Sequence, residues 1–146
     1  MNYTIFDPTT GEIISTMSAP SYADIESHLS DKSFIEGNFT GSRFYVDIPT
    51  TTVVEKSTDP SSDTVKYDWK YDTKSWIVNV QATAELIRSQ RSSLLYAIDR
   101  INPVWYNSLS AEQQTQLAQY RQLLLDVPQQ AGFPTQIEWP TKPNWL

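Results

Sequence analysis

The sequence predicts an α+β fold. We expect a small β-rich N-terminal module with a short helix, then a β-hairpin, an antiparallel helix pair and an extended C-terminal tail rich in proline and tryptophan. Three observations predict this order. Short runs of alternating apolar and polar residues come first, and after Gln81 the apolar residues recur at helical spacing. The last helical run stops at Pro128, because proline fixes φ and lacks a backbone N–H.

The N-terminal module is expected to cover residues 1–48 and to open with a β-hairpin. Residues 3–6 and 12–17 have the composition of strands. Between them, residues 7–11 contain aspartate, proline and glycine, which are typical of hairpin turns longer than two residues.

The rest of this module is expected to contain one helix and a second hairpin. Ser21 is a suitable N-cap for a short helix over residues 22–29. Residues 33–38 and 43–48 are predicted to pair through a turn at residues 39–42. Polar and apolar residues alternate in the second of these strands, which predicts that it is half-buried.

Residues 49–63 are rich in proline, threonine, serine and aspartate, which predicts a linker with one short strand at residues 53–55. The remaining part, residues 64–146, is expected to form a second module. It begins with a hairpin made of residues 65–71 and 76–80, in which aromatic residues occupy one face of the first strand.

Two amphipathic helices are expected next. The first covers residues 84–101 and ends at Asn102 and Pro103. The second begins at Ser110, because a serine followed three residues later by Gln113 is the pattern of a capping box. The apolar stripe of the first helix contains Ile87, Arg91, Leu94, Leu95, Ile98 and Ile101, and that of the second contains Leu117, Tyr120, Leu123, Leu124 and Val127.

The C-terminal tail contains four of the nine prolines, counted from Pro128, and two of the five tryptophans. Proline-rich segments cannot extend a helix or enter the middle of a sheet. The tail therefore either folds back on its own helices or docks on another chain. In the second case Phe133, Trp139 and Trp145 would be the anchors, since aromatic side chains dominate interface hot spots.

The negative charge is concentrated in the N-terminal part. Residues 1–60 contain nine acidic and three basic side chains, whereas residues 61–146 contain eight of each. Nucleic-acid binding needs a basic surface, and no segment has one. No run approaches the ~20 apolar residues of a membrane span. We therefore expect neither a nucleic-acid partner nor a membrane partner.

Catalytic and cofactor sites are not expected. Cysteine is absent and His28 is the single histidine, which nearly excludes a metal site with nitrogen or sulfur ligands. The four glycines do not form a phosphate-binding loop, and the carboxylates occur singly at turns. We predict a protein that is not an enzyme, with no catalytic residue, no metal and no cofactor.

Two clusters allow alternative interpretations. Arg88 and Arg91 share one side of a helix. They either face solvent or form a salt bridge to Glu85, or else they bind a carboxylate of another protein. The aromatic residues around the later hairpin form either a small core or a ligand cage. They are Trp69, Tyr71 and Trp76.

Several motifs occur together in a specific order. Tyrosine and aspartate precede tryptophan at residues 71–76, and an arginine-bearing helix runs through Leu94 and Leu95 to Asp99. In this order the chain resembles the tail assembly chaperone (tail fibre assembly) proteins of tailed bacteriophages. The other matching segments are residues 120–124, 126–130, 132–134 and 139–140, and the likeness covers most of residues 67–146. Residues 3–13 resemble the N-terminus of many small phage tail proteins.

One position departs from the family pattern. The family usually has tryptophan directly after the helix aspartate, whereas here Arg100 follows Asp99. The next tryptophan of this chain is Trp105.

The resemblance implies a non-enzymatic protein that binds a tail fibre or baseplate protein during its folding, trimerisation or attachment. It would act in the host cell cytoplasm during assembly. The alternative is a structural virion protein, bound permanently in the tail, fibre or baseplate as an adaptor. Self-association is left open. The expected partner-binding residues are Tyr120, Arg121, Pro128, Phe133, Pro134, Trp139, Pro140 and Trp145.

Overall fold

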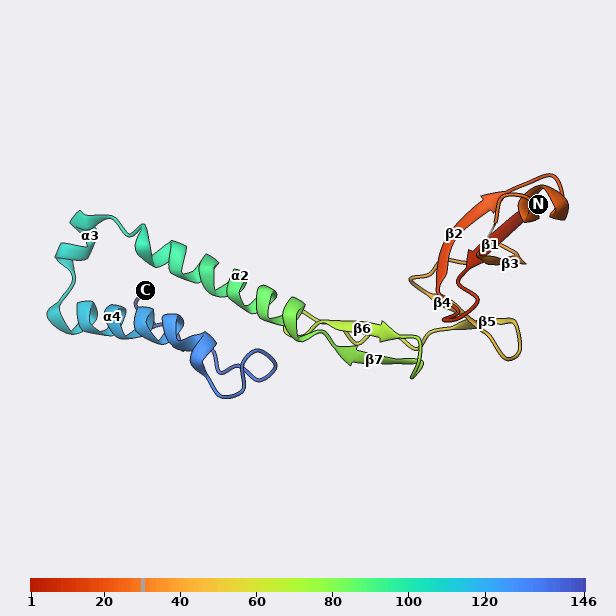
Figure 1. Cartoon of the computed structure of the whole chain (residues 1–146). Coiled ribbons are helices and arrows are strands. Elements are labelled where there is room, and N and C mark those ends of the chain that lie inside the picture. The colour runs from red at the N-terminus through yellow and green to blue at the C-terminus, as the bar shows by residue number, and fades with distance from the viewer. Residues whose placement is uncertain (30) are drawn as a thin grey trace. The chain divides into compact units, whose positions relative to one another are not determined.

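The computed structural model describes residues 1–29 and 31–146, which form two compact units (Figure 1). The first unit consists of Met1–Pro60 and Asp68–Ile77, and the second of Ser61–Tyr67 and Val78–Leu146. Strands dominate the first unit and helices the second, so the predicted α+β class is confirmed. The sequence-based division, with boundaries after residues 48 and 63, stays a prediction.

A three-stranded antiparallel sheet opens the first unit. Its strands are β1 (Asn2–Phe6), β2 (Ile13–Ser18) and β3 (Ser33–Glu36), in the order β2-β1-β3. The hairpin predicted at the N-terminus is therefore confirmed. Helix α1 (Tyr22–Glu26) begins after Ser21 as expected but ends three residues before the predicted end.

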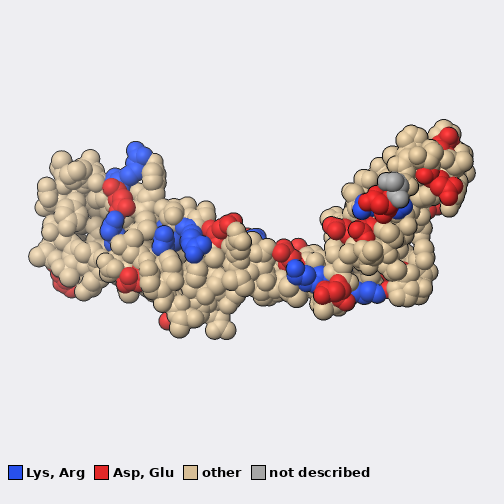
Figure 2. Space-filling view, viewed as in Figure 1, with Lys and Arg blue, Asp and Glu red and all other residues tan. Residues whose placement is uncertain are grey.

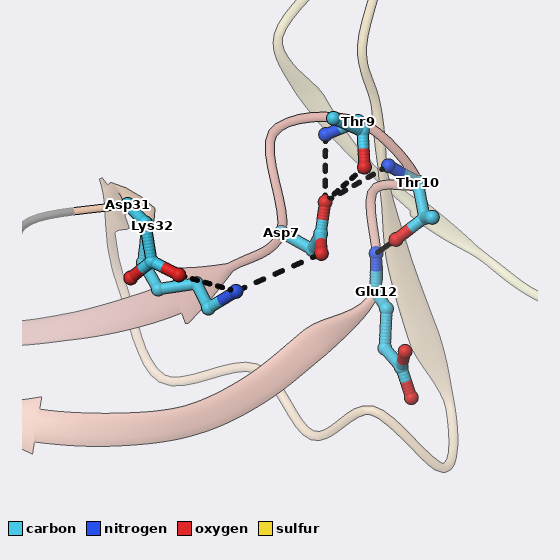
Figure 3. A network of polar contacts seen from close by, with 6 residues as sticks. All are labelled: Asp7, Thr9, Thr10, Glu12, Asp31 and Lys32. Carbon is cyan, nitrogen blue, oxygen red and sulfur yellow. Dashed lines mark hydrogen bonds and ion pairs between the residues drawn. The ribbon is translucent and has the colours of Figure 1, made fainter.

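The turn between β1 and β2 is organised by one carboxylate. Asp7 Oδ1 accepts hydrogen bonds from the backbone N–H of Thr9 at 2.7 Å and of Thr10 at 3.2 Å, and from the Thr9 hydroxyl (Figure 3). Lys32 lies 3.7 Å from the other carboxylate oxygen. The hydrogen bonds from Thr9, ahead of the charge of Lys32, hold the pKa of Asp7 below its ordinary value. Asp7 thus has the turn-forming role typical of aspartate.

Gly11 closes this turn where no side chain fits. Its φ of 78° is in the left-handed region that favours glycine. A Cβ atom at this position would lie 2.0 Å from the carbonyl oxygen of Val46. Instead the Val46 N–H donates to the Gly11 carbonyl at 2.9 Å. The absent side chain therefore allows the turn to pack directly on the strand that contains Val46.

The second predicted hairpin is wrong. β3 pairs with β1, whereas β4 (Phe44–Asp47) pairs with β5 (Thr52–Glu55). The buried Thr4 hydroxyl explains the difference, because it donates to the Gly37 carbonyl at 2.9 Å and accepts from the Phe39 N–H at 3.0 Å. These bonds hold the end of β3 against β1.

Strand β4 is also more buried than its alternating pattern predicts. Tyr45 and Val46 are consecutive residues on opposite faces, and both are buried. β5 lies within the predicted linker and confirms the short strand expected there.

The later hairpin, β6 (Tyr67–Lys70) and β7 (Ser75–Val78), is confirmed. The Trp69 ring lies 5.4 Å from Trp76 and 5.6 Å from Tyr45, between ring centroids. The Lys56 ammonium lies 5.5 Å from the Trp69 ring and donates to the Gly41 carbonyl at 2.5 Å. The aromatic residues therefore form a small core that contains one of the chain's own lysines. Burial lowers the pKa of Lys56, against the opposing charge of Glu12.

Three helices form most of the second unit. They are α2 (Val80–Asp99), α3 (Pro103–Ser108) and α4 (Ala111–Asp126), and a 3-10 turn, η1 (Val127–Gln129), follows α4. Figure 1 shows α2 and α4 running antiparallel, as predicted. The joining segment contains helix α3, which the sequence-based prediction missed. No helix within residues 1–29 and 31–146 is long and apolar enough to cross a membrane.

Side-chain caps determine where these helices begin. Asn79 accepts from the Ala82 N–H at 2.8 Å, so α2 begins four residues before the predicted start. Asn102 caps α3 in the same way, with Pro103 at its first position. The predicted capping box of α4 is confirmed by both of its hydrogen bonds, between Ser110 and Gln113.

The buried face of α4 is narrower than predicted. Leu124 is 0% exposed, whereas its neighbour Leu123 is 54% exposed, so the assignment of Leu123 to the buried stripe is wrong. On α2, Ile87 is buried, whereas Leu94 is 40% exposed and leaves the predicted stripe. The other buried residues of the α4 stripe are Leu117, Tyr120 and Val127, which follow one another at helical spacing.

The two neighbouring leucines of α4 provide a test of its register. We expect Leu124→Ala to lower the free energy of unfolding by about 2–5 kcal/mol, since it removes fully buried methyl groups and leaves a cavity. Leu123→Ala is the matched control and should cost about 0.5 kcal/mol or less. Urea unfolding followed by circular dichroism measures both. Equal losses in the two variants would contradict the register of α4.

Candidate partner-binding surface

The C-terminal tail packs on the helices of its own unit. The Trp145 indole N–H donates to Oε1 of Gln116 on α4 at 2.5 Å, and the Trp145 and Trp105 ring centroids are 6.3 Å apart. Earlier in the tail, the guanidinium of Arg88 on α2 lies 5.3 Å from the centre of the Phe133 ring. Of the two alternatives for the tail, folding back on its own helices is thus the one observed in this chain.

A side-chain amide fixes the first part of the tail. Gln130 Nε2 donates to the Glu138 carbonyl at 2.8 Å, and Gln130 Oε1 accepts from the Glu138 N–H at 2.9 Å. Within this loop the Gln136 N–H donates to the Gly132 carbonyl at 2.7 Å. A Cβ atom on Gly132 would lie 2.3 Å from the Gln136 carbonyl oxygen, so the close turn requires glycine.

An ion pair joins the two long helices. Arg121 of α4 donates through Nε to Oδ1 of Asp99, at the end of α2, at 2.7 Å. Both side chains are about half exposed, so the pair orients the helices more than it stabilises them. The hydrogen bond from Arg121 holds the pKa of Asp99 below its ordinary value. The guanidinium of Arg100, the residue after Asp99, lies 4.9 Å from the centre of the Tyr96 ring.

Two hollows lie between α4 and the tail and meet at Leu123. One has a volume of about 720 Å³ and lies against Asp126, Glu138, Trp139 and Pro140, among other residues. The other, of about 440 Å³, extends along Gln116 and Gln119 to the segment from Thr141 to Asn144. We call these two hollows together the α4–tail groove.

A second apolar region lies around α3. Val104 is 79% exposed, and Trp105 and Tyr106 are also exposed. Tyr106 and Leu117 contribute to a third hollow of about 340 Å³, next to the ion pair of Asp99 with Arg121. Exposed aromatic and aliphatic side chains of this kind are typical of protein-binding surfaces.

The structure separates the residues predicted to bind a partner into three groups. Tyr120 and Pro134 are buried within the unit. Arg121, Phe133 and Trp145 make the contacts with other residues of the chain described above, and Pro128 lies in the 3-10 turn after α4. Trp139 and Pro140 line the α4–tail groove, where another chain could reach them. The assignment of these eight residues to partner binding stays a prediction.

The two arginines of α2 differ in their surroundings. Arg88 is exposed, as expected for a residue that faces solvent, whereas binding of another protein's carboxylate stays a prediction. Arg88 lies over Phe133 and, within the described residues, forms no ion pair with Glu85. The Nε atom of Arg91 is buried and has no hydrogen-bond partner in the described part of the chain. His28 makes local contacts, with its Nδ1 2.7 Å from the Asp24 carbonyl oxygen.

Sequence reasoning missed three glutamine contacts and the ion-pair partner of Arg121. Gln116 binds Trp145, Gln130 holds Glu138, and Gln114 donates to the Tyr106 carbonyl at 3.2 Å. Glutamine is frequent on exposed helix surfaces, so its presence indicates no particular contact. Asp99 and Arg121 are 22 residues apart, and only the antiparallel packing of α2 and α4 brings them together.

The charges divide between the two units as the sequence predicts. On the face shown in Figure 2, acidic side chains predominate over the strands of the first unit, whereas both signs occur along the helices of the second. In residues 1–29 and 31–146, no cluster of three or more metal-ligating side chains occurs.

A comparison with known proteins found a match within the second unit. Residues 84–144, within this unit, match the family model described as phage tail assembly chaperone protein. The resemblance inferred from the sequence is therefore confirmed over most of α2, α3, α4 and the tail. The match does not extend to residues 3–13 or 71–76. No curated protein and no solved structure was found to match the chain.

The ion pair between Asp99 and Arg121 can be tested by titration. The pKa of Asp99 is lower in the folded protein than its ordinary value of 3.8. The ion pair therefore stabilises the fold above pH 3.8, and this stabilisation is lost as the pH falls through the pKa of the folded state. We expect Arg121→Gln to raise the pKa of Asp99 toward 3.8, as measured by carboxyl-carbon NMR. Arg100→Gln is the matched control and should leave it unchanged. An unchanged Asp99 pKa in Arg121→Gln would show that the pair is absent in solution.

Proposed function

We propose that this protein is a non-enzymatic phage tail assembly chaperone that binds a tail fibre or baseplate protein during folding or attachment. The observation that carries the proposal is the match of residues 84–144 to the tail assembly chaperone family. These residues include the helix pair and most of the tail that forms one wall of the α4–tail groove. Assembly of the tail would place this activity in the host cell cytoplasm.

The physical character of the second unit supports a chaperone role. Its exposed apolar side chains, such as Leu123 and Val104, are surrounded by glutamines and charged residues. An apolar centre with a polar rim can cover the unassembled surface of a partner and release it when a better-fitting surface arrives. The proposal assigns the partner contact to the second unit.

The first unit would act separately from this contact. We propose that the acidic N-terminal module, residues 1–48, faces solvent or adds a second contact, with residues 49–63 as the linker to residues 64–146. Like charges repel, so a module with nine acids and three bases within residues 1–60 would also keep unassembled complexes soluble.

Co-expression with each candidate tail protein, followed by a pull-down, tests the proposal. We expect one tail fibre or baseplate protein to co-purify with the wild-type chain. Trp139→Ala should weaken this binding several-fold more than Thr141→Ala, because aromatic side chains in hollows contribute most to interfaces. Both residues belong to the tail, so Thr141→Ala controls for a general effect of changing it. Failure of every tail protein to bind would overturn the proposal.

A structural adaptor that stays in the virion is the second candidate. The rigid closure of the tail by Gln130 and Trp145 favours it, because a preformed surface suits permanent docking. Quantitative mass spectrometry of purified virions separates the two candidates. A transient chaperone is absent from the virions or present far below the amount of its partner, whereas an adaptor is present in fixed proportion to it.

A further inference from the structure

The α4–tail groove has the length and shape for a short extended peptide. The residues of α4 that line it run from Gln116 to Asp126, and ten helical steps correspond to about 15 Å. An extended chain rises about 3.3 Å per residue, so about four or five residues would fit along this distance. The tail forms the other wall, and Leu123 lies where the two hollows meet.

The groove offers both apolar surface and a free donor. Leu123 is 54% exposed although it belongs to an amphipathic helix. The half-buried Trp139 lies beside it in the larger hollow. Its indole N–H forms no hydrogen bond within the part of the chain that the structure describes, so it can donate to a backbone carbonyl of an occupant.

The charges of the groove define the occupant further. Asp126 and Glu138 both line the larger hollow, and neither forms an ion pair with any residue that the structure describes. The Asp126 carboxylate accepts a hydrogen bond from the neutral Gln122 amide, at 2.9 Å. The C-terminal end of α4 adds a partial negative charge at the same place. Lys142 lines the smaller hollow, so the groove has an acidic end and a basic end.

We propose that the α4–tail groove binds an extended segment of the partner tail protein. The segment carries an apolar side chain that packs on Leu123. An arginine or lysine next to it pairs with Asp126 and Glu138 and stacks on Trp139. This inference rests on the proposed function, because it names the part of the tail protein that the chaperone recognises.

A direct binding measurement with the full-length chain tests the groove. The probe is a short fluorescein-labelled peptide in which leucine alternates with arginine, and the readout is fluorescence anisotropy. We expect Asp126→Asn combined with Glu138→Gln to weaken binding about tenfold at low salt, and Leu123→Ser to weaken it by a similar factor. A matching peptide with glutamate in place of arginine should bind at least about tenfold more weakly.

The matched control changes the net charge by the same amount, but at positions outside the groove. Asp63→Asn combined with Glu85→Gln removes two exposed carboxylates of the same unit, and it should leave binding unchanged. Raising the salt to about 0.5 M should weaken wild-type binding and narrow the difference from the double variant. If the double variant does not fold, as judged by circular dichroism, Glu138→Gln alone should weaken binding about threefold.

Three results would overturn the inference. In the first, the groove and control variants lose binding equally, which indicates unspecific attraction to negative charge. In the second, the glutamate peptide binds as well as the arginine peptide. In the third, sedimentation shows a dimer that excludes the peptide, which makes a second copy the occupant.

The same variants separate this inference from the proposed function. If the tail protein binds the double variant with wild-type affinity, the groove is not its binding site, although the chaperone function stands. If no tail protein binds the wild-type chain, the proposed function fails, and the inference about a tail-protein segment fails with it, even where the peptide binds.

Discussion

The packing of the C-terminal tail against α2 and α4 is the interaction on which the second unit depends. Two helices of this length are marginal when isolated, and each has only one narrow apolar face to bury. The tail adds Phe133 under Arg88 and Trp145 between Gln116 and Trp105. A half-buried tryptophan contributes about 2–3 kcal/mol by the area it removes from water. The tail therefore contributes an essential part of a small core, and its prolines keep it extended along the helices.

This closure also creates the surface that a partner can reach. Leu123, which is 54% exposed, and Trp139 both line the groove between α4 and the tail. The tail thus has two roles, since its ends stabilise the fold while its middle part lines the groove. A protein that covers another chain during assembly needs such a surface. The surface must be apolar enough to bind the other chain, and its parts must be held firmly enough that the protein itself remains soluble.

The sequence predicted the elements better than their pairing. Period, capping and proline positions are local signals, and they correctly identified the helix pair, the capping box at Ser110 and two of the hairpins. Strand pairing is not local. The turn at residues 39–42 is compatible with a hairpin, but the buried hydroxyl of Thr4, more than thirty residues away, holds Gly37 and Phe39 against β1. The candidate site was predicted least completely, because whether Leu123 or Leu124 is buried depends on where the tail lies.

The most direct test of tail closure is a nuclear Overhauser measurement on the free, full-length protein. We expect cross-peaks between the indole protons of Trp145 and both the ring protons of Trp105 and the side-chain amide protons of Gln116, since these groups are in contact or adjacent. The side-chain amide protons of Gln119 are the internal reference, because Gln119 also lines the groove but forms no hydrogen bond with Trp145. If the Trp145 indole shows none of these cross-peaks and its N–H exchanges as fast as in an unfolded peptide, the tail does not close on the helices.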